Sequence, residues 1–133
     1  MKLRKNISVE EIECNCGCGL NKISPATLDI VQDVREHFKK PVFINNRGHS
    51  ACRCEKHNAE VGGSENSKHK PDEQGICRAI DFEVDGVTPK EVFDYLNTKY
   101  PNNLAIGLYD TFVHINDAVT ERRRWNKSSK WVL

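Results

Sequence analysis

Two helix starts of the same chemical kind set the layout of this chain. Pro25 and Pro89 each follow a hydroxyl residue, Ser24 and Thr88, so each place offers an N-cap and then proline at the first helical position. Apolar residues recur at helical spacing after the first proline, which predicts a helix over residues 25–38. The same pattern after the second proline predicts another helix, which the next proline in the chain ends. We expect the first of these helices to cover one face of a sheet.

Short apolar runs around these helices predict the strands of that sheet. Runs bounded by turn-forming residues predict four strands, at Val42–Asn46, Ile76–Val84, Leu104–Leu108 and Phe112–Asn116. A short helix is predicted over Cys52–Val61, where two glycines end it, and the closing KWVL is expected to add a last edge strand. Strands interleaved with helices indicate an α+β fold, with a small, mostly antiparallel sheet packed against two or three helices.

The size and charge of the chain limit what it can be. Its 133 residues fit one domain, and we expect residues 1–133 to form it, with residues 1–20 as an irregular, Cys-rich arm packed on it. The 20 basic and 19 acidic residues are interspersed, so the net charge of +1 creates no field that attracts nucleic acid or an anionic membrane. We expect a monomer with neither of those partners. The basic run Arg122–Arg124 is expected to be a solvated face.

The N-terminal sequence predicts where the protein is made. It lacks the apolar core of a secretory signal, and no apolar run approaches the roughly 20 residues that cross a bilayer. We therefore expect synthesis in the cytoplasm without a signal peptide. Disulfides are disfavoured there, because the cytosol keeps thiols reduced.

The six cysteines allow two interpretations. Cys14, Cys16 and Cys18 are separated by single residues, and either Cys52 or Cys54 would supply a fourth thiolate for a closed structural zinc site. Their C-x-C spacing differs from the usual C-x2-C spacing of zinc fingers. The alternative is a set of buried thiols, or disulfides that form after release into an oxidising environment. The sequence leaves both interpretations open.

Two histidines and an aspartate are candidates for a second metal site. His69 lies in a polar loop, Asp81 lies in the apolar run Ile76–Val84, and His114 lies in the last predicted core strand. A carboxylate in an apolar strand is rarely buried unless it is paired or bound to a metal. Without a metal, His69 would be a surface residue and His114 a hydrogen-bonded core histidine. Together, the three would hold a zinc ion and leave its fourth position open, as catalytic zinc requires.

These residues stand in motifs that resemble the M15 family of zinc peptidases. The motifs are RC-x-x-HN-x-x-VGG, N-S-x-H, A-x-D and FVHI, with an N-terminal C-x-C-G-C-G, an I-S-P helix start and a P-V-x-I-N strand. The resemblance is to the D-alanyl-D-alanine carboxypeptidase-like group, in its phage and bacterial cell-wall hydrolase branch, and it covers about residues 12–125. It implies a hedgehog-like or DD-peptidase-like fold. It also implies a zinc-dependent carboxypeptidase or endopeptidase of peptidoglycan stem peptides, with His69, Asp81 and His114 as zinc ligands.

The peptidase hypothesis also predicts roles for residues outside the triad. Arg53 offers a planar donor group to a substrate carboxylate, although a structural salt bridge is the alternative. Ser67 would brace the loop or the substrate by a hydrogen bond. The general base is sought a few residues before His114, where Asp110 is the leading candidate. Four extended residues span about 13 Å, so Asp110 reaches the site only if the chain bends near Thr111.

The sequence departs from the family pattern in two places. Eleven residues, Lys70–Ile80, separate the first histidine from the aspartate, which is more than the family usually has. Asp72 or Glu73 in this insertion is therefore a rival ligand or base. Asn116 stands two residues after the last histidine, where this branch often has an aspartate, so the contribution of that carboxylate is weakened or missing.

Two other functions compete with the peptidase. One is a binding module that keeps the scaffold and the zinc, recognises cell-wall peptides and has lost catalysis. The other is a cysteine-based metal or redox protein in which the histidines are incidental. The peptidase hypothesis also predicts where the protein acts. We expect it to act on the cell wall after a phage-type release, as an endolysin does, or as part of a virion.

Overall fold

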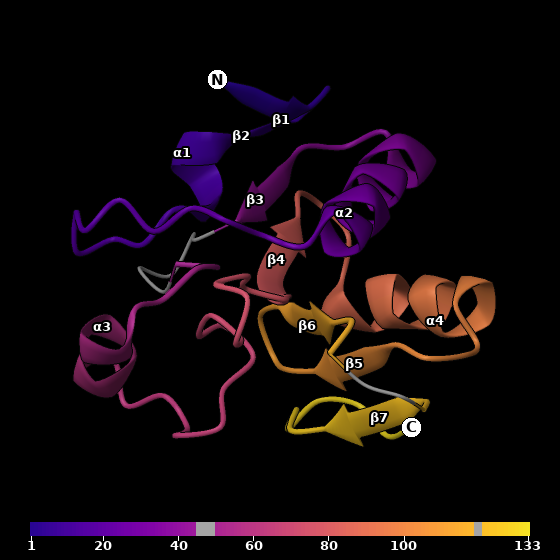
Figure 1. Cartoon of the computed structure of the whole chain (residues 1–133). Coiled ribbons are helices and arrows are strands. Elements are labelled where there is room, and N and C mark those ends of the chain that lie inside the picture. Colours follow the sequence, from indigo (N-terminus) through magenta and orange to yellow (C-terminus); the bar gives the residue numbers. More distant parts are fainter. Residues whose placement is uncertain (45–49, 119–120) are drawn as a thin grey trace.

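A five-stranded sheet lies at the centre of the protein (Figure 1). The computed structural model describes residues 1–44, 50–118 and 121–133. The strands of this sheet are β3 (Val42–Ile44), β4 (Ala79–Val84), β5 (Ala105–Leu108), β6 (Val113–Asn116) and β7 (Arg123–Asn126). They lie in the order β3-β4-β6-β5-β7, and neighbours are antiparallel except for β5 and β7. A separate hairpin pairs β1 (Lys2–Arg4) with β2 (Ile7–Ser8).

Four helices complete the described part of the chain. They are α1 (Val9–Ile12), α2 (Pro25–Phe38), α3 (Glu55–Glu60) and α4 (Pro89–Lys99). Figure 1 shows α2 and α4 on one side of the sheet and α1 and α3 on the other, together with the long connecting loops. The predicted α+β fold with a small, mostly antiparallel sheet is therefore confirmed.

The two faces of the sheet carry different residues. On β4, Ile80 and Phe82 belong to the apolar core that also includes residues of α2 and α4. Successive side chains of a strand point to opposite faces, so Asp81 between them faces away from these helices. On β6, Ile115 lies in the same core and His114 faces the other way. The face opposite α2 and α4 is thus the one that carries the candidate ligands.

Most predicted elements are present with slightly different ends. Helix α2 has the predicted bounds. Strand β4 begins at Ala79 rather than Ile76, and α3 covers only Glu55–Glu60 of the longer predicted helix. The predicted end of the first strand at Asn46 lies outside the described residues.

The two helix starts are built differently. Thr88 Oγ1 accepts a hydrogen bond from Glu91 N at 3.2 Å, as an N-cap does. Ser24 makes no such bond, because its Oγ donates to Asp117 Oδ2 at 2.6 Å. Pro25 therefore begins α2 without a side-chain cap, and Ser24 instead ties this helix start to the segment that follows β6.

The N-terminal arm is more regular than the sequence predicted. Residues 2–12 form β1, β2 and α1, and only the following stretch to Lys22 has no helix or strand. A capping box starts α1, where Ser8 N donates to Glu11 Oε1 at 2.9 Å. Elements of two to four residues are too short to show a hydrophobic period, which is why the prediction missed them.

The C-terminal edge of the sheet also differs from the prediction. The expected strand at KWVL is wrong, since residues 130–133 form no strand and Arg123–Asn126 pairs with β5 instead. The expected solvated face is wrong for Arg124, whose guanidinium donates to Asn97 Oδ1 at 2.6 Å and to Tyr100 O at 2.8 Å. Arg124 therefore ties β7 to the end of α4, while its two basic neighbours are exposed.

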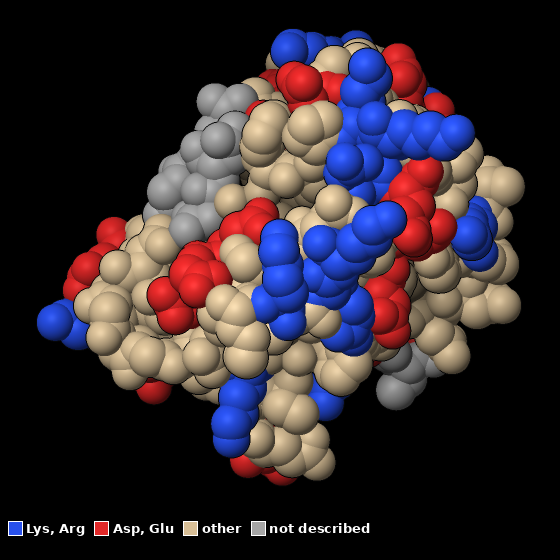
Figure 2. All heavy atoms as spheres, turned by 90° about the horizontal axis from the view of Figure 1, so that it is seen from above, with Lys and Arg blue, Asp and Glu red and all other residues tan. Residues whose placement is uncertain are grey.

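Charged side chains of both signs share the surface. Figure 2 shows Lys and Arg side chains bordered by Asp and Glu side chains on one face of the molecule, in keeping with the net charge of +1. Among the described residues, no helix combines the length and the apolar character that crossing a membrane requires.

Candidate metal centre

A row of four residues crosses the face of the sheet opposite α2 and α4. Asp81 on β4 lies opposite His114 on β6, His114 lies opposite Gly107 on β5, and Gly107 lies opposite Trp125 on β7. Residues directly opposite each other on neighbouring strands share one face. The row therefore presents a carboxylate, an imidazole, a position without a side chain and an indole.

His69 joins this row from the loop between α3 and β4. Its Nε2 lies 3.2 Å from Asp81 Oδ2, and His114 Nδ1 lies 2.7 Å from Asp81 Oδ1. One ligand atom from each of the three residues lies within 4.8 Å of the other two. The structure thus brings together the three residues that the sequence singled out as metal ligands.

The second nitrogen of each imidazole is held by the protein. His69 Nδ1 donates to Ala51 O at 2.9 Å, and because a carbonyl oxygen only accepts, the proton must be on Nδ1. His114 Nε2 lies 3.0 Å from the side-chain nitrogen of Asn116. Contacts of this kind fix the orientation of metal-binding histidines. In both rings they leave the other nitrogen directed at Asp81.

Burial and charge set the protonation states of the site. Burial lowers the pKa of His69, which is 4% exposed, and this outweighs the opposite effect of Asp81. Burial alone would raise the pKa of Asp81, but its electrostatic interactions with the neighbouring imidazoles of His69 and His114 outweigh burial, so this pKa is lowered. The site therefore offers an unprotonated imidazole nitrogen and an ionised carboxylate, which are the forms that bind a metal.

The contact between His69 Nε2 and Asp81 Oδ2 favours a bound cation. A neutral His69 with its proton on Nδ1 has a lone pair on Nε2, and this atom faces Asp81 Oδ2 at 3.2 Å. Two acceptors that face each other repel, whereas a cation between them is attracted to both. Two imidazole nitrogens and one carboxylate oxygen are a zinc donor set, and three protein ligands leave the fourth position open. The triad fits a catalytic zinc ion.

Arg53 lies buried next to the triad. Its residue is 6% exposed, and its Nε has no hydrogen-bond partner among the described residues. Burial lowers the pKa of Arg53 and the charge of Asp81 raises it, but a guanidinium stays charged in either case. The alternative role of a salt bridge is not realised within residues 1–44, 50–118 and 121–133. Arg53 therefore has donor capacity to spare beside the site.

Polar residues of the loop that carries His69 brace it. Ser67 Oγ accepts from His69 N at 3.2 Å, which braces the loop, and its contact with substrate stays a prediction. Asp72 Oδ1 accepts from Ile76 N at 3.0 Å, and its Oδ2 accepts from Arg78 Nε at 2.8 Å. These bonds fold the extra residues of the loop into a turn and engage the carboxylate of Asp72 there, which disfavours Asp72 as a rival ligand, whereas Glu73 stays untested.

Asp110 lies in the turn between β5 and β6. Its Oδ1 accepts from Ser129 N at 2.6 Å and its Oδ2 accepts from Ser129 Oγ at 2.9 Å. The hydrogen bonds from Ser129 lower the pKa of Asp110. In this structure the carboxylate therefore holds the C-terminal turn, and its role as general base stays a prediction.

Sequence reasoning missed Trp125, which forms one wall of the site. Its ring centroid lies 5.4 Å from that of His114, and its Nε1 donates to Tyr109 Oη at 3.0 Å. A Cβ on Gly107 would come within 2.4 Å of the indole, so the ring lies where only glycine leaves room. Glycine inside a strand often marks such a close approach, and this signal was available in the sequence.

A groove of about 460 Å³ opens beside the triad on the same side of the sheet. Part of its lining is the next row of opposed residues, formed by Asn116, Ala105 and Arg123. Lys68 adds a second basic side chain, and the remaining lining residues are Asn66, Ala118, Glu121 and Trp125. Binding sites for small ligands commonly have volumes of about 300 to 1,000 Å³, so the groove has room for a short peptide.

Comparison with known families identifies the chain. A sequence model of the family described as peptidase M15 matches residues 4–116 of the 133. The chain belongs to the peptidase M15 family. Comparisons with curated proteins and with solved structures found no significant match. The match spans all three members of the triad, so the candidate zinc ligands lie within the region that defines the family.

This member of the M15 family has a second group of side chains that could bind a metal. Four sulfur atoms lie within 4.8 Å of one another, and they belong to Cys14, Cys16, Cys18 and Cys54. Of the two predicted candidates for the fourth member, the structure selects Cys54. Cys52 is buried elsewhere, and its Sγ donates to Lys22 O at 3.6 Å. Both this cluster and the triad present donor atoms that can bind a metal.

Proposed function

We propose that the protein is a zinc-dependent peptidase that hydrolyses peptide bonds in peptidoglycan stem peptides, as a carboxypeptidase or an endopeptidase. The observation that carries the proposal is the convergence of His69, Asp81 and His114: His69 Nε2 lies 3.2 Å from Asp81 Oδ2, and one ligand atom of each residue lies within 4.8 Å of the other two. A zinc ion held there by His69, Asp81 and His114 would supply Lewis acidity to activate a water and polarise a peptide carbonyl. Family membership supports the reaction class, and the surroundings of the triad support the substrate class.

Arg53 is the residue best suited to bind a carboxylate of the substrate. It is buried and charged, and its Nε lacks a partner among the described residues. An incoming carboxylate would accept from this unpartnered Nε, in a geometry that the planar guanidinium favours. Stem peptides carry such groups at their free terminus and on D-glutamate. Arg53 would therefore orient the peptide, and Ser67 would keep its bracing role in the loop.

The groove beside the triad supports a short, anionic peptide as the substrate. Lys68 and Arg123 line it and outnumber its one acidic residue, Glu121. Trp125 adds an apolar wall that reaches the neighbourhood of His114. A peptide lying in this groove would place one of its bonds close to the triad, while its carboxylates meet the basic side chains.

A wall substrate also requires a route to the wall. We keep the phage-type route, by release from the cell or within a virion, as part of the proposal. This route follows from the proposed substrate, which lies in the cell wall. A monomer is sufficient for this function, since the triad and the groove come from one chain.

One observation favours a second function, a binding module that recognises wall peptides without cleaving them. The side chain that contacts His114 Nε2 is the amide of Asn116, where this branch of the family often has a carboxylate. An uncharged partner makes the imidazole less basic than a carboxylate would. Turnover of peptidoglycan separates the two functions, because the binding module would hold zinc and peptide and release no product.

The deciding experiment is peptidoglycan digestion by the wild type and by Asp81→Asn. Removal of a ligand charge should cost several kcal/mol of transition-state stabilisation, which corresponds to about a 10³-fold loss of rate. Released peptides and new amino termini would be quantified by mass spectrometry. Asp85→Asn is the matched control, since Asp85 is exposed at the end of the same strand and should leave the rate unchanged.

Two results of this assay would count against the peptidase. A wild type that holds zinc and binds stem peptides but releases nothing would favour the binding module. Equal rates for the wild type and Asp81→Asn would remove the triad from the mechanism. In the same assay, Asp110→Asn should abolish turnover and retain zinc if Asp110 is the general base. An unchanged rate would show that Asp110 only holds the C-terminal turn.

A further inference from the structure

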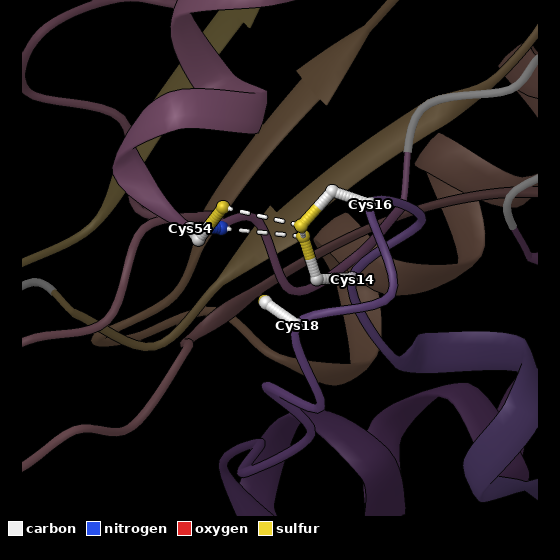
Figure 3. Close-up of side chains that lie close together, drawn as sticks. All are labelled: Cys14, Cys16, Cys18 and Cys54. Carbon is white, nitrogen blue, oxygen red and sulfur yellow. Dashed lines mark hydrogen bonds between the residues drawn. The ribbon is translucent and has the colours of Figure 1, made fainter.

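Four cysteine side chains point toward one another where the N-terminal arm meets the start of α3 (Figure 3). Three of them come from one five-residue stretch, and the fourth, Cys54, immediately precedes α3. Cys14 is buried, Cys54 is half-buried, and Cys16 and Cys18 are exposed. Peptide hydrolysis at the triad makes no use of these thiols, so their convergence requires another explanation.

The distances between the sulfur atoms are close to those of a metal-bound cluster. Cys14 Sγ lies 3.4 Å from Cys16 Sγ, and Cys16 Sγ lies 3.5 Å from Cys54 Sγ. Zinc–sulfur bonds of about 2.3 Å in a tetrahedron place sulfur atoms about 3.8 Å apart. These two distances are within a few tenths of an ångström of that spacing, and all four sulfur atoms lie within 4.8 Å of one another, so small movements would let them surround a single ion.

The backbone around the cluster is arranged to support negative charge on sulfur. Gly17 and Gly19 have φ values of 80° and 85°, so the chain turns after Cys16 and again after Cys18 in conformations that suit glycine. Cys54 N donates to the sulfur of Cys14 at 3.5 Å. His57 N donates to the sulfur of Cys54 at 3.4 Å. Amide donors directed at sulfur are the outer contacts that stabilise metal-bound thiolates.

We propose that Cys14, Cys16, Cys18 and Cys54 bind one Zn²⁺ ion as a closed structural site. Each thiol releases its proton on binding, and the four thiolates fill the tetrahedron so that no position is left for water. Thiolate is a soft ligand, which favours zinc over magnesium or calcium. The site therefore stabilises structure and takes no direct part in peptide hydrolysis.

Residues Ala51–Cys54 form a strap that connects the cysteine cluster to the triad. The zinc ion would hold this strap to the N-terminal arm, and we call the ion with its four cysteines the clamp. On one side, Cys52 N donates to Ile12 O of the arm at 2.9 Å, and Cys54 belongs to the cluster. On the other side, Ala51 O accepts from His69 Nδ1 at 2.9 Å, and Arg53 N donates to His69 O at 3.0 Å. The clamp thus positions His69 without touching substrate, and this second step rests on the proposed function of the triad.

The test is zinc per chain, measured by elemental analysis on protein that is kept reduced. The wild type should hold about two zinc ions, and Cys16→Ser/Cys18→Ser and His69→Ala/His114→Ala should each hold about one. Cys16 and Cys18 are suited to substitution because both are exposed. Cys52→Ala and His37→Ala are the matched controls, since both residues lie outside the two groups, and each should keep about two.

Cobalt substitution identifies the ligands of each ion. Co²⁺ bound to thiolates shows strong sulfur-to-metal charge transfer in the near ultraviolet. We expect this band in the wild type and in His69→Ala/His114→Ala, and we expect its loss in Cys16→Ser/Cys18→Ser. Equal zinc in the wild type and the cysteine variant, or a mass showing disulfides among these cysteines in the purified protein, would overturn the clamp.

The two proposals fail in different ways. If the cysteine variant loses one zinc and the histidine variant loses none while folded, the clamp stands and the peptidase falls. If the reverse holds, the clamp falls and the peptidase stands. The positioning of His69 has its own readout, which is the zinc affinity of the triad in Cys16→Ser/Cys18→Ser. It should fall about 10- to 100-fold, as it does when outer contacts of a ligand are lost, and an unchanged affinity would remove the positioning step.

Discussion

The histidine triad and the cysteine cluster are held by different kinds of structure. Asp81 and His114 lie opposite each other on neighbouring strands, so the hydrogen bonds of the sheet fix their separation. Three of the four cysteines lie in a stretch with neither helix nor strand, and the sulfur atoms contact mainly one another and two backbone amides. The fold therefore preforms the triad, whereas the cluster depends on whatever joins its sulfurs.

This difference suits the two sites to different work. A catalytic metal needs ligands that keep their positions while the fourth position exchanges water, substrate and product. A structural metal can itself supply the order that the surrounding chain lacks. In this protein the sheet would hold the reactive ion, and the second ion would hold the arm against the strap that supports His69.

Chelation should separate the two sites with the largest effect. Removing zinc from the cluster should lower Tm by on the order of 10 °C, because tetrathiolate sites contribute several kcal/mol and 1 kcal/mol shifts Tm by about 4 °C in a domain of this size. Amide hydrogen exchange in residues 13–22 should accelerate. Removing zinc from the triad should abolish hydrolysis and leave exchange in β4 and β6 unchanged.

The two double variants allow each metal site to be measured without the other. His69→Ala/His114→Ala retains only the cluster, and Cys16→Ser/Cys18→Ser retains only the triad, so one chelator titration of each assigns every change to one site. Scanning calorimetry gives Tm, and mass spectrometry gives the exchange rates. Faster exchange in β4 and β6 after loss of the triad metal would show that the sheet does not preform that site.

The sequence predicted those parts of the site whose signals are local. Asp81 stood out because a carboxylate interrupts an apolar strand, and α2 was predictable from a proline start and helical spacing. Strand β7 was not, because it pairs in parallel with β5 and not with β6, the strand before it in the chain, and its own run of basic residues resembles a solvent-exposed segment. Local pattern thus identified the candidate ligands, and strand pairing supplied the wall that Trp125 forms beside them.

The cysteines and Asp110 show the same limit at the level of single residues. Cys52 and Cys54 are two positions apart, and only the packing of the arm decides which one faces the other three thiols. Asp110 is the acidic residue nearest before His114 in the sequence, yet its carboxylate binds Ser129, which lies 19 residues further on. Proximity in sequence identified the candidates for the fourth thiolate and for the general base. It could not show which of them lies close enough to act.

Asn116→Ala should weaken the preformed site by an intermediate amount. Its amide lies 3.0 Å from His114 Nε2 and steadies the ring whose other nitrogen faces Asp81. Loss of such a contact typically costs 10- to 100-fold in metal affinity or activity. Zinc competition assays and peptidoglycan turnover would measure both quantities.

A second variant at this position tests the cause of that loss. Asn116→Asp should retain zinc affinity, because a carboxylate can accept a proton from Nε2 and leave Nδ1 of His114 free for the metal. Equal affinities for the wild type and Asn116→Ala would show that the strand pairing alone orients His114. The triad would then depend even more on the sheet than the comparison with the cluster suggests.

The smallest effect is expected from Asp33→Asn, which weakens the fold away from both metal sites. Asp33 on α2 accepts hydrogen bonds from Tyr95, Tyr100 and Lys99 of the α4 region. Partial burial would raise the pKa of Asp33, but these bonds outweigh it and the pKa is lowered. Exchanging the carboxylate for an amide should cost about 2 kcal/mol of the free energy of unfolding at neutral pH, as the loss of bonds to a charged group does.

The pH dependence of this loss follows from the direction of the pKa shift. Because the folded-state pKa is below the unfolded value of about 3.9, the carboxylate contributes fully above pH 3.9 and loses its contribution as the pH falls through the folded value. Urea unfolding of metal-free protein should therefore show a difference between the wild type and Asp33→Asn that shrinks in acid. Asp94→Asn is the control, since its exposed pair with Lys90 is worth less than about 0.5 kcal/mol. If Asp33→Asn also changed the zinc content, the helix-covered face of the sheet would be coupled to the metal-binding face. Metal binding would then depend on the packing of α2 as well as on the residues around each site.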